Sequence, residues 1–266
     1  MDIVVPVKLV PDLVEELVVD TNGAELDAAW LRLQLSEFDG HAIEQAILLK
    51  ERIGGQVTIV CPEGEGADDV LYMAAAKGAD RLIKLGGDVG QAVRLGRNHA
   101  LARAMAGVVR ELQPDLVLTG VQSHDDLDGS VGPLVAGFLG LPYVGYVAGV
   151  TIAADVAMAR KEYPGGLVAE MEVALPAVLG IQASDQPPRY VAFSRIRQAM
   201  KTAAIEERPV APLAKTGDYR GLDGSGGPTV SRMYKPESAT RATMIAGGAG
   251  EVAARLVDIF RELGIL

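Results

Sequence analysis

The chain has 266 residues, of which 49% are hydrophobic and 5% aromatic, and its formal net charge is −10. This length predicts one large domain or one domain with an appendage, and so acidic a chain is not expected to bind nucleic acid, which requires a basic face. One cysteine, Cys61, excludes an internal disulfide and suits a reducing cytoplasm, and we expect neither a secretory signal nor membrane insertion.

Strands and helices are predicted to alternate over the first half of the chain. Short apolar runs predict strands at residues 2–7, 56–60, 81–85 and 116–119. Apolar residues at helical spacing predict helices at residues 39–53, 67–79 and 91–112. This order is typical of a doubly wound, mostly parallel α/β sheet with right-handed crossovers, of the Rossmann-like or adenine nucleotide α hydrolase-like kind.

The stretch from residue 114 to residue 142 carries the most informative pattern. A buried strand is followed by a polar loop and then by a helix predicted at residues 133–139. Free N–H groups and the dipole at a helix N-terminus favour an anion, so Ser130, Gly132 and the backbone around them could bind a phosphate. The pattern is neither a P-loop nor a G-x-G-x-x-G fingerprint. An ordinary strand-to-helix turn capped by Ser130 explains the residues equally well.

The pattern changes after residue 142. Connections become short, and a turn is predicted at residues 163–166. We interpret this part as an antiparallel meander added to the sheet, with strands at residues 143–150, 168–174 and 177–182.

Little periodicity remains from residue 200 onward. Prolines and glycines, including the linker Gly224-Ser225-Gly226-Gly227, predict an extended arm that ends in an amphipathic helix at residues 251–263. Such an arm buries little surface alone, so we expect it to dock on the main domain or on a partner. The predicted organisation is an α/β nucleotide-binding domain over residues 1–199 and this arm over residues 200–266.

No set of nucleophile, base and acid is evident, and no catalytic residue is predicted. The three histidines fall in three different predicted elements. His41 and His99 are interpreted as surface or capping residues. His124 lies in the polar loop, where it is either a nucleotide contact or an ordinary loop residue.

Three acidic residues of the same loop, Asp125, Asp126 and Asp128, resemble metal ligands, but their spacing does not match an EF-hand loop. Carboxylates repel a phosphate unless they cap backbone groups or face solvent. We therefore favour capping and turn formation, predict no metal, and keep Mg²⁺ as the alternative. Cys61 could approach an adenine or could be a buried structural thiol.

The segment from Arg189 to Arg197 is unusual in an acidic chain. Phe193 lies among Arg189, Arg195 and Arg197, next to Tyr190. An apolar anchor surrounded by arginines is typical of a protein-docking surface. The alternative is that Phe193 packs into the domain.

Several short motifs together resemble one known family over nearly the whole chain. They are Val5-Pro6-Val7-Lys8-Leu9-Val10-Pro11-Asp12, Ser36-Glu37-Phe38-Asp39, Ala76-Lys77-Gly78-Ala79-Asp80-Arg81, Gly120-Val121-Gln122-Ser123, Gly165-Gly166-Leu167, Leu175-Pro176-Ala177-Val178 and Pro188-Arg189-Tyr190. This set resembles the β subunit of electron transfer flavoprotein. The 120–123 loop and the tail around Arg232-Met233-Tyr234 are most similar to carriers that serve bacterial amine dehydrogenases.

The resemblance implies an electron carrier and not an enzyme. It implies a heterodimer with a larger α subunit that holds most of the FAD, and a structural AMP in the β subunit. Such a carrier takes single electrons from a flavoprotein dehydrogenase, of the amine or acyl-CoA type, and delivers them to a quinone-linked acceptor.

The resemblance also implies site residues by position. Leu13 and Phe38 would lie near the flavin, and the docking segment would comprise Arg189, Tyr190, Phe193, Arg195 and Arg197. The AMP shell would comprise Pro6, Ser36, Glu37, Phe38, Asp39, Cys61, Pro62, Gly120, Val121, Gln122, Ser123, His124, Asp125, Asp126, Leu127, Asp128, Gly129, Ser130, Val131 and Gly132.

Departures from the family pattern leave alternatives open. Val131 replaces a threonine or serine common near the AMP phosphate, so Ser130 or backbone N–H groups would supply those bonds. Relatives that bind NADH and a second FAD and bifurcate electrons usually show G-R-Q-A-x-D-G-D-T before V-G-P; here Val121 replaces the arginine and Leu127 interrupts the pattern. A third alternative is a stand-alone adenine-nucleotide-binding regulator.

Overall fold

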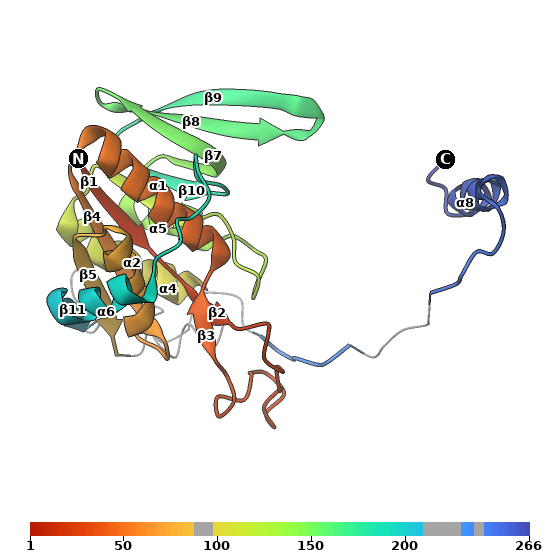
Figure 1. Cartoon of the computed structure of the whole chain (residues 1–266), viewed down its shortest axis with the longest axis horizontal. Helices are drawn as coiled ribbons and strands as arrows, with labels where there is room; N and C mark the ends of the chain where they lie inside the picture. The colour runs from red at the N-terminus through yellow and green to blue at the C-terminus, as the bar shows by residue number, and fades with distance from the viewer. Residues whose placement is uncertain (88–97, 210–229, 237–241) are drawn as a thin grey trace. The chain divides into compact units, whose positions relative to one another are not determined.

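The structure is a computed structural model that describes residues 1–87, 98–209, 230–236 and 242–266 (Figure 1). The chain divides into two units, Met1–Met233 and Tyr234–Leu266, each of which is described by itself. The linker predicted at residues 224–227 lies outside the described residues.

The first unit is built on a nine-stranded sheet with the order β11-β5-β4-β1-β6-β10-β7-β8-β9. Its strands are β1 (Asp2–Pro6), β4 (Gln56–Pro62), β5 (Arg81–Gly86), β6 (Leu116–Gly120), β7 (Tyr143–Ala153), β8 (Val156–Tyr163), β9 (Leu167–Ala174), β10 (Ala177–Ile181) and β11 (Ile205–Pro209). All pairs from β11 to β7 are parallel, and β7, β8 and β9 pair in antiparallel fashion. The predicted doubly wound, mostly parallel sheet with an antiparallel addition is therefore confirmed.

Three strands differ from the sequence prediction. The predicted meander strand at 177–182 is β10, which lies parallel between β6 and β7 because all five of its residues are buried on both sheet faces. The second strand of the meander is instead β8, which was not predicted because its second half is charged. β11 lies in the segment predicted as an arm, and it forms the edge of the sheet next to β5, where Glu206 accepts hydrogen bonds from Arg81.

Helices cover both faces of the sheet. On one face, α1 (Glu37–Ile53) contacts α2 (Ala67–Lys77), which in turn contacts α6 (Phe193–Thr202). On the other face, α4 (Asn98–Leu112) packs against α5 (Val131–Leu139). The long helix predicted at residues 91–112 is described from Asn98 onward, and residues 91–97 lie outside the described residues.

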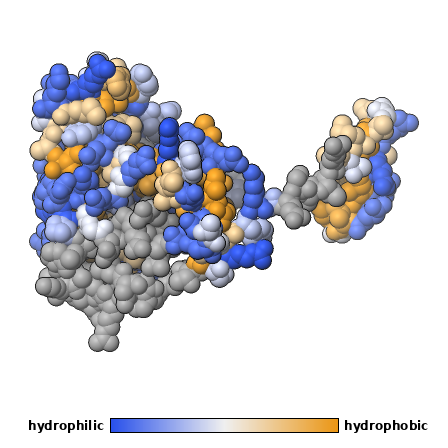
Figure 2. Space-filling model, turned by 90° about the horizontal axis from the view of Figure 1, so that it is seen from below, coloured by the Kyte–Doolittle hydropathy of each residue, from blue (hydrophilic) through white to orange (hydrophobic). Residues whose placement is uncertain are grey.

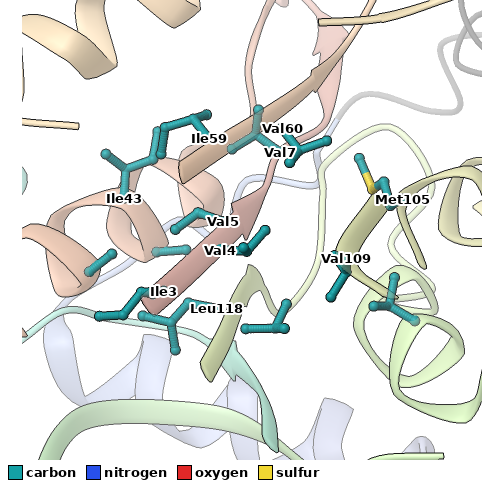
Figure 3. Close-up of a cluster of buried hydrophobic side chains, with 14 of the residues drawn as sticks. Ile3, Val4, Val5, Val7, Ile43, Ile59, Val60, Met105, Val109 and Leu118 are labelled. Carbon is teal, nitrogen blue, oxygen red and sulfur yellow. The ribbon is translucent and has the colours of Figure 1, made fainter. Parts of the chain in front are cut away.

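The apolar core lies on both sides of the central strands. Figure 3 shows β1 between two helices, with Ile43 of α1 on one side and Met105 and Val109 of α4 on the other. These side chains are almost completely buried. Alternating residues of a strand point to opposite faces, so one apolar run anchors both helical layers.

A small two-stranded sheet lies beside the main one. Strands β2 (Leu9–Pro11) and β3 (Leu33–Leu35) pair in antiparallel fashion and frame a loop with exposed apolar side chains. These side chains are Leu13, Val14, Leu17, Val18 and Trp30.

The second unit contains α8 (Ala249–Glu262), which matches the predicted terminal helix. None of its residues is buried, and one side of it is apolar while the other is hydrophilic (Figure 2). In the described ranges, no helix combines the length and apolarity that a membrane crossing requires.

Candidate functional site

A cavity lies at the carboxyl ends of β1 and β6. In the sheet, β4 lies on one side of β1 and β6 lies on the other. The strand order therefore reverses between β1 and β6. Parallel α/β sheets bind ligands at such a point. The empty space in the cavity, including a part that is open to solvent, is about 330 Å³. Its walls comprise Pro6, Val7, Lys8, Asp39, Asn98, Met105, Thr119, Gly120, Val121, Gln122, Ser123, Asp126, Gly129, Ser130 and Val131.

The buried carboxylate of Asp39 joins three elements at this point. From the first turn of α1, it accepts the backbone N–H of Lys8 through Oδ2 and that of Gly120 through Oδ1, each at 2.7 Å. Burial raises the pKa of Asp39 to about 7, against the opposing effect of the two N–H groups and the Lys8 charge. Asp39 therefore fixes the loop after β1 against the end of β6.

The side chain of Lys8 fixes the polar loop to the same place. Its Nζ donates to Ser123 Oγ at 3.0 Å and pairs with Asp125 at 2.8 Å and with Asp126. The side chains of Asp125 and Asp126 are only 13% and 16% exposed. Burial raises the pKa of Asp126, but the bonds from Lys8 and Asn98 outweigh it, and the net pKa is lowered.

The remaining acidic groups shape the loop itself. Asp126 accepts the N–H of Asp128 at 3.1 Å, and Asp128 accepts the N–H of Ser130 at 2.8 Å. Leu127 and Gly129 have left-handed backbone angles, with φ of 57° and 62°. These contacts are the capping and turn formation that the sequence predicted. No group of three or more potential metal ligands occurs in the described parts of the chain.

Two buried polar atoms in the cavity wall have no hydrogen-bond partner within the described residues. They are Oδ1 of Asn98 and Oγ1 of Thr119. Buried polar atoms are almost always paired, so two such atoms in one cavity wall indicate a polar partner there, either a ligand or water. The start of α5 agrees with this: Ser130 makes no side-chain cap, contrary to the ordinary-turn alternative, and its helix can present N–H groups to an anion.

The structure brings together part of the predicted AMP shell. Ten of its members line the cavity: Pro6, Asp39, Gly120, Val121, Gln122, Ser123, Asp126, Gly129, Ser130 and Val131. The others are outside its walls: Ser36, Glu37, Phe38, Cys61, Pro62, His124, Asp125, Leu127, Asp128 and Gly132. His124 contacts the carbonyl of Pro11 at 2.8 Å, and burial raises the pKa of the Cys61 thiol.

Sequence reasoning missed five wall residues, namely Val7, Lys8, Asn98, Met105 and Thr119. Val7 and Lys8 directly follow a predicted strand, and Thr119 ends another, so the rule for carboxyl ends of parallel strands could have found them. Asn98 and Met105 lie on a helix and carry no such local signal.

The two residues predicted near a flavin lie in different surroundings. Leu13 is 61% exposed, in the loop between β2 and β3, whereas Phe38 is half-buried in the first turn of α1.

The predicted docking segment has a buried side and an exposed side. Arg189 is engaged inward: its Nε donates to the buried Glu44 at 2.8 Å, and its two other guanidinium nitrogens donate to Glu51. Phe193 begins α6 and is 63% exposed, with the Arg197 guanidinium 4.8 Å from its ring centre. Val191 and Ala199, and not Phe193, pack against α2.

Comparisons with known proteins agree on one family. The family model described as electron transfer flavoprotein domain matches residues 29–213. The chain is 34% identical over 266 residues to the electron transfer flavoprotein subunit beta of Methylophilus methylotrophus, with 98% of each chain covered. It is 34% identical over 200 residues to the corresponding subunit of Syntrophomonas wolfei, with 75% of each covered. The Mycobacterium tuberculosis subunit is 29% identical over 263 residues, with 94% of each covered.

Proposed function

The chain belongs to the electron transfer flavoprotein family as a β subunit, and from this premise we propose that it binds AMP in the cavity between β1 and β6 and carries electrons together with an α subunit. In this proposal the α subunit holds most of the FAD. A flavoprotein dehydrogenase, of the amine or acyl-CoA type, donates single electrons, and a quinone-linked protein accepts them. We also propose a cytoplasmic location, in keeping with a lone, buried cysteine.

The observation that carries the adenylate site is the pair of unpartnered atoms in the cavity wall. Oδ1 of Asn98 and Oγ1 of Thr119 are buried and need a polar ligand. The N-terminus of α5, next to Ser130 and Val131, is suited to a phosphate because its N–H groups and dipole favour an anion. Lys8 offsets the charge of Asp125 and Asp126, and Asn98 donates a hydrogen bond to Asp126, so the carboxylates repel such a ligand less.

In this proposal the FAD supplies the one-electron chemistry, and this chain supplies contacts around it. Leu13 would contact the flavin, because it is exposed next to other apolar side chains of the same loop. Apolar groups there would exclude water from that edge. Phe38, half-buried in the first turn of α1, would be the second residue near the flavin. None of the chain's residues would act as acid, base or nucleophile.

Two features support an α subunit as the partner. α8 has an apolar side formed by Leu256, Val257 and Phe260 and continued by Leu263 directly after the helix, and none of its residues is buried. An amphipathic helix is stable only when its apolar side is covered. We propose that the segment from residue 234 onward docks on the α subunit.

We propose that the exposed side of the docking segment contacts the dehydrogenase. Tyr190 is 90% exposed and Phe193 is 63% exposed, and Arg195 and Arg197 are exposed beside them. Aromatic and arginine side chains contribute most of the energy in many interfaces, and the positive charge favours an acidic partner surface. Transient electron-transfer contacts need only a small surface of this kind.

The proposal is tested by isolating the native complex and identifying the nucleotides that it releases on denaturation. One FAD and one AMP per heterodimer are expected. Two FAD and no AMP would instead support the electron-bifurcating alternative, which Val121 and Leu127 disfavour. A chain that is isolated without an α subunit and with an adenine nucleotide would support the regulator. A complex without any adenine nucleotide in this subunit would contradict the AMP site.

A further inference from the structure

Asn98, the first residue of α4, lines the cavity. One end of its side-chain amide is hydrogen-bonded within the described residues, and the other end is not. The residue is 6% exposed, so both ends of its amide are removed from water. Its Oδ1 has no hydrogen-bond partner within the part of the chain that the structure describes. A buried acceptor without a partner costs about 1–3 kcal/mol, so the atom indicates a group that arrives from outside.

The contacts of Asn98 settle which end of its amide is free. The other end lies 2.5 Å from Oδ2 of Asp126 and 3.0 Å from Oδ1 of Asp128. Ionised carboxylates only accept hydrogen bonds, so the atom between them must be the donating Nδ2. The free atom is therefore the oxygen, which accepts and cannot donate.

No donor from the described residues reaches this oxygen. Lys8, the lysine of the cavity wall, is engaged by Ser123, Asp125 and Asp126. A phosphate that has lost its protons cannot serve either, because it only accepts hydrogen bonds. A nucleotide that pairs with Oδ1 must therefore do so through a neutral donor on another part of the molecule.

We propose that Asn98 recognises a hydrogen-bond donor of the bound nucleotide, either a ribose hydroxyl or the amino group of the base, and thereby determines which nucleotides the site accepts. The inference rests on the proposed adenylate site. A site with a buried polar atom rejects a ligand that leaves this atom unpaired, whereas added or missing apolar groups discriminate weakly. Selection by Asn98 therefore acts on ligand donors and not on ligand size.

The experiment uses the full-length heterodimer, freed of bound nucleotide by dialysis. Dissociation constants are measured by calorimetry for AMP, 2′-deoxy-AMP, 3′-deoxy-AMP and purine riboside 5′-monophosphate, which lacks the amino group. At least one analogue is expected to bind about tenfold or more weakly than AMP. The analogue that is affected identifies the hydroxyl or the amino group as the partner of Asn98.

Variants then assign this preference to Asn98. In Asn98→Ala and Asn98→Leu, the ratio between the affected analogue and AMP should fall to within about twofold. Asp128→Asn serves as a matched control, because it alters the loop that Asn98 holds while leaving Oδ1 in place. A loosened loop lowers all affinities in parallel and preserves the ratio, which separates recognition from a structural role.

The outcomes distinguish the two proposals. Tight binding of AMP with equal affinity for all three analogues overturns the role of Asn98 and leaves the adenylate site standing. A preference that persists in both Asn98 variants also overturns it. Failure of AMP itself to bind overturns the adenylate site and this inference together. The analogue series on the unaltered complex can overturn the role of Asn98 by itself. The inference can therefore be tested even if neither variant folds.

Discussion

Oδ1 of Asp39 lies 2.7 Å from the backbone nitrogen of Gly120, and there is no room for a side chain between them. A Cβ atom at position 120 would lie 2.5 Å from this oxygen and 2.8 Å from the backbone nitrogen of Asp39. The first turn of α1 therefore touches the end of β6 directly. Both residues also line the cavity.

The first prediction is that Gly120→Ala impairs the cavity and lowers stability. The added methyl group must displace the backbone of α1 and not merely a flexible side chain, which should cost about 1–3 kcal/mol in unfolding free energy. Chemical unfolding and AMP affinity, measured on the same preparation, provide the readout.

Gly137→Ala is the control for that substitution. Gly137 is exposed on α5, and a Cβ atom there meets nothing within 4 Å. Because glycine weakens a helix relative to alanine, this change should add about 0.5–1 kcal/mol of stability. Equal effects of the two substitutions would show that the approach of Asp39 to Gly120 is not tight.

The second prediction concerns the pH dependence that Asp39 imposes. Its pKa in the folded protein is about 7, whereas the ordinary pKa of an aspartate is 3.8. Between about pH 4 and pH 7 the folded state thus binds more protons than the unfolded state. The contribution of Asp39 to stability is complete below about pH 4 and is lost as the pH rises through 7.

Asp39→Asn removes this titration, because an amide does not ionise. The unfolding free energy of the unaltered protein, relative to the variant, should fall from pH 5 to pH 8 by about 1.4 kcal/mol or more. Denaturant titrations at four pH values measure this difference. Two parallel pH profiles would contradict it and would mean that Asp39 stays ionised when buried.

The sequence predicted those parts of the fold that depend on local pattern. The apolar runs of β1, β4, β5 and β6 and the helices between them follow from periodicity alone. β11 was not predicted, because the charged segment Ile205–Pro209 shows no alternation of apolar and polar residues. Its place at the sheet edge follows from the ion pair between Glu206 and Arg81, which only the fold brings together.

The site was predicted in part for a similar reason. The polar loop could be recognised because strand, loop and helix are neighbours in the sequence. The role of Lys8 could not be predicted, because its contact with Ser123 joins residues that are 115 positions apart in the sequence. Asn98 is likewise connected to the loop only by the fold, through Asp126 and Asp128. Arg189 was assigned to the docking surface by composition, whereas the structure engages it with Glu44 and Glu51.

The third prediction is that Thr119→Val separates the binding of AMP from that of adenosine. Oγ1 of Thr119 is buried without a partner among the described residues, and it lies beside Gly132 in the first turn of α5. If the phosphate binds at this turn, the hydroxyl donates to it. Valine keeps the shape of threonine, so AMP affinity should fall about tenfold while adenosine affinity is unchanged.

Calorimetric titration with both ligands tests this prediction. The nucleotide-free variant should also be somewhat more stable, because an unpaired buried hydroxyl has been removed. A parallel loss of affinity for AMP and adenosine would indicate that Thr119 acts on the base or ribose, or on the structure of the wall.

The fourth prediction separates contact from support in the docking segment. Phe193 is exposed, so Phe193→Ala should leave unfolding unchanged and slow electron uptake from the dehydrogenase about tenfold or more at low donor concentration. Arg189→Gln removes the cation that holds the buried Glu44 and should lower the unfolding free energy by about 1–3 kcal/mol. The flavin spectrum should stay the same in both variants, since neither residue is among those that we place near the flavin.

Stopped-flow reduction together with denaturant unfolding distinguishes the two roles. If Phe193→Ala takes up electrons at the unaltered rate, the exposed aromatic side chain makes no contact with the donor. If Arg189→Gln is as stable as the unaltered chain, Arg189 does not anchor the segment.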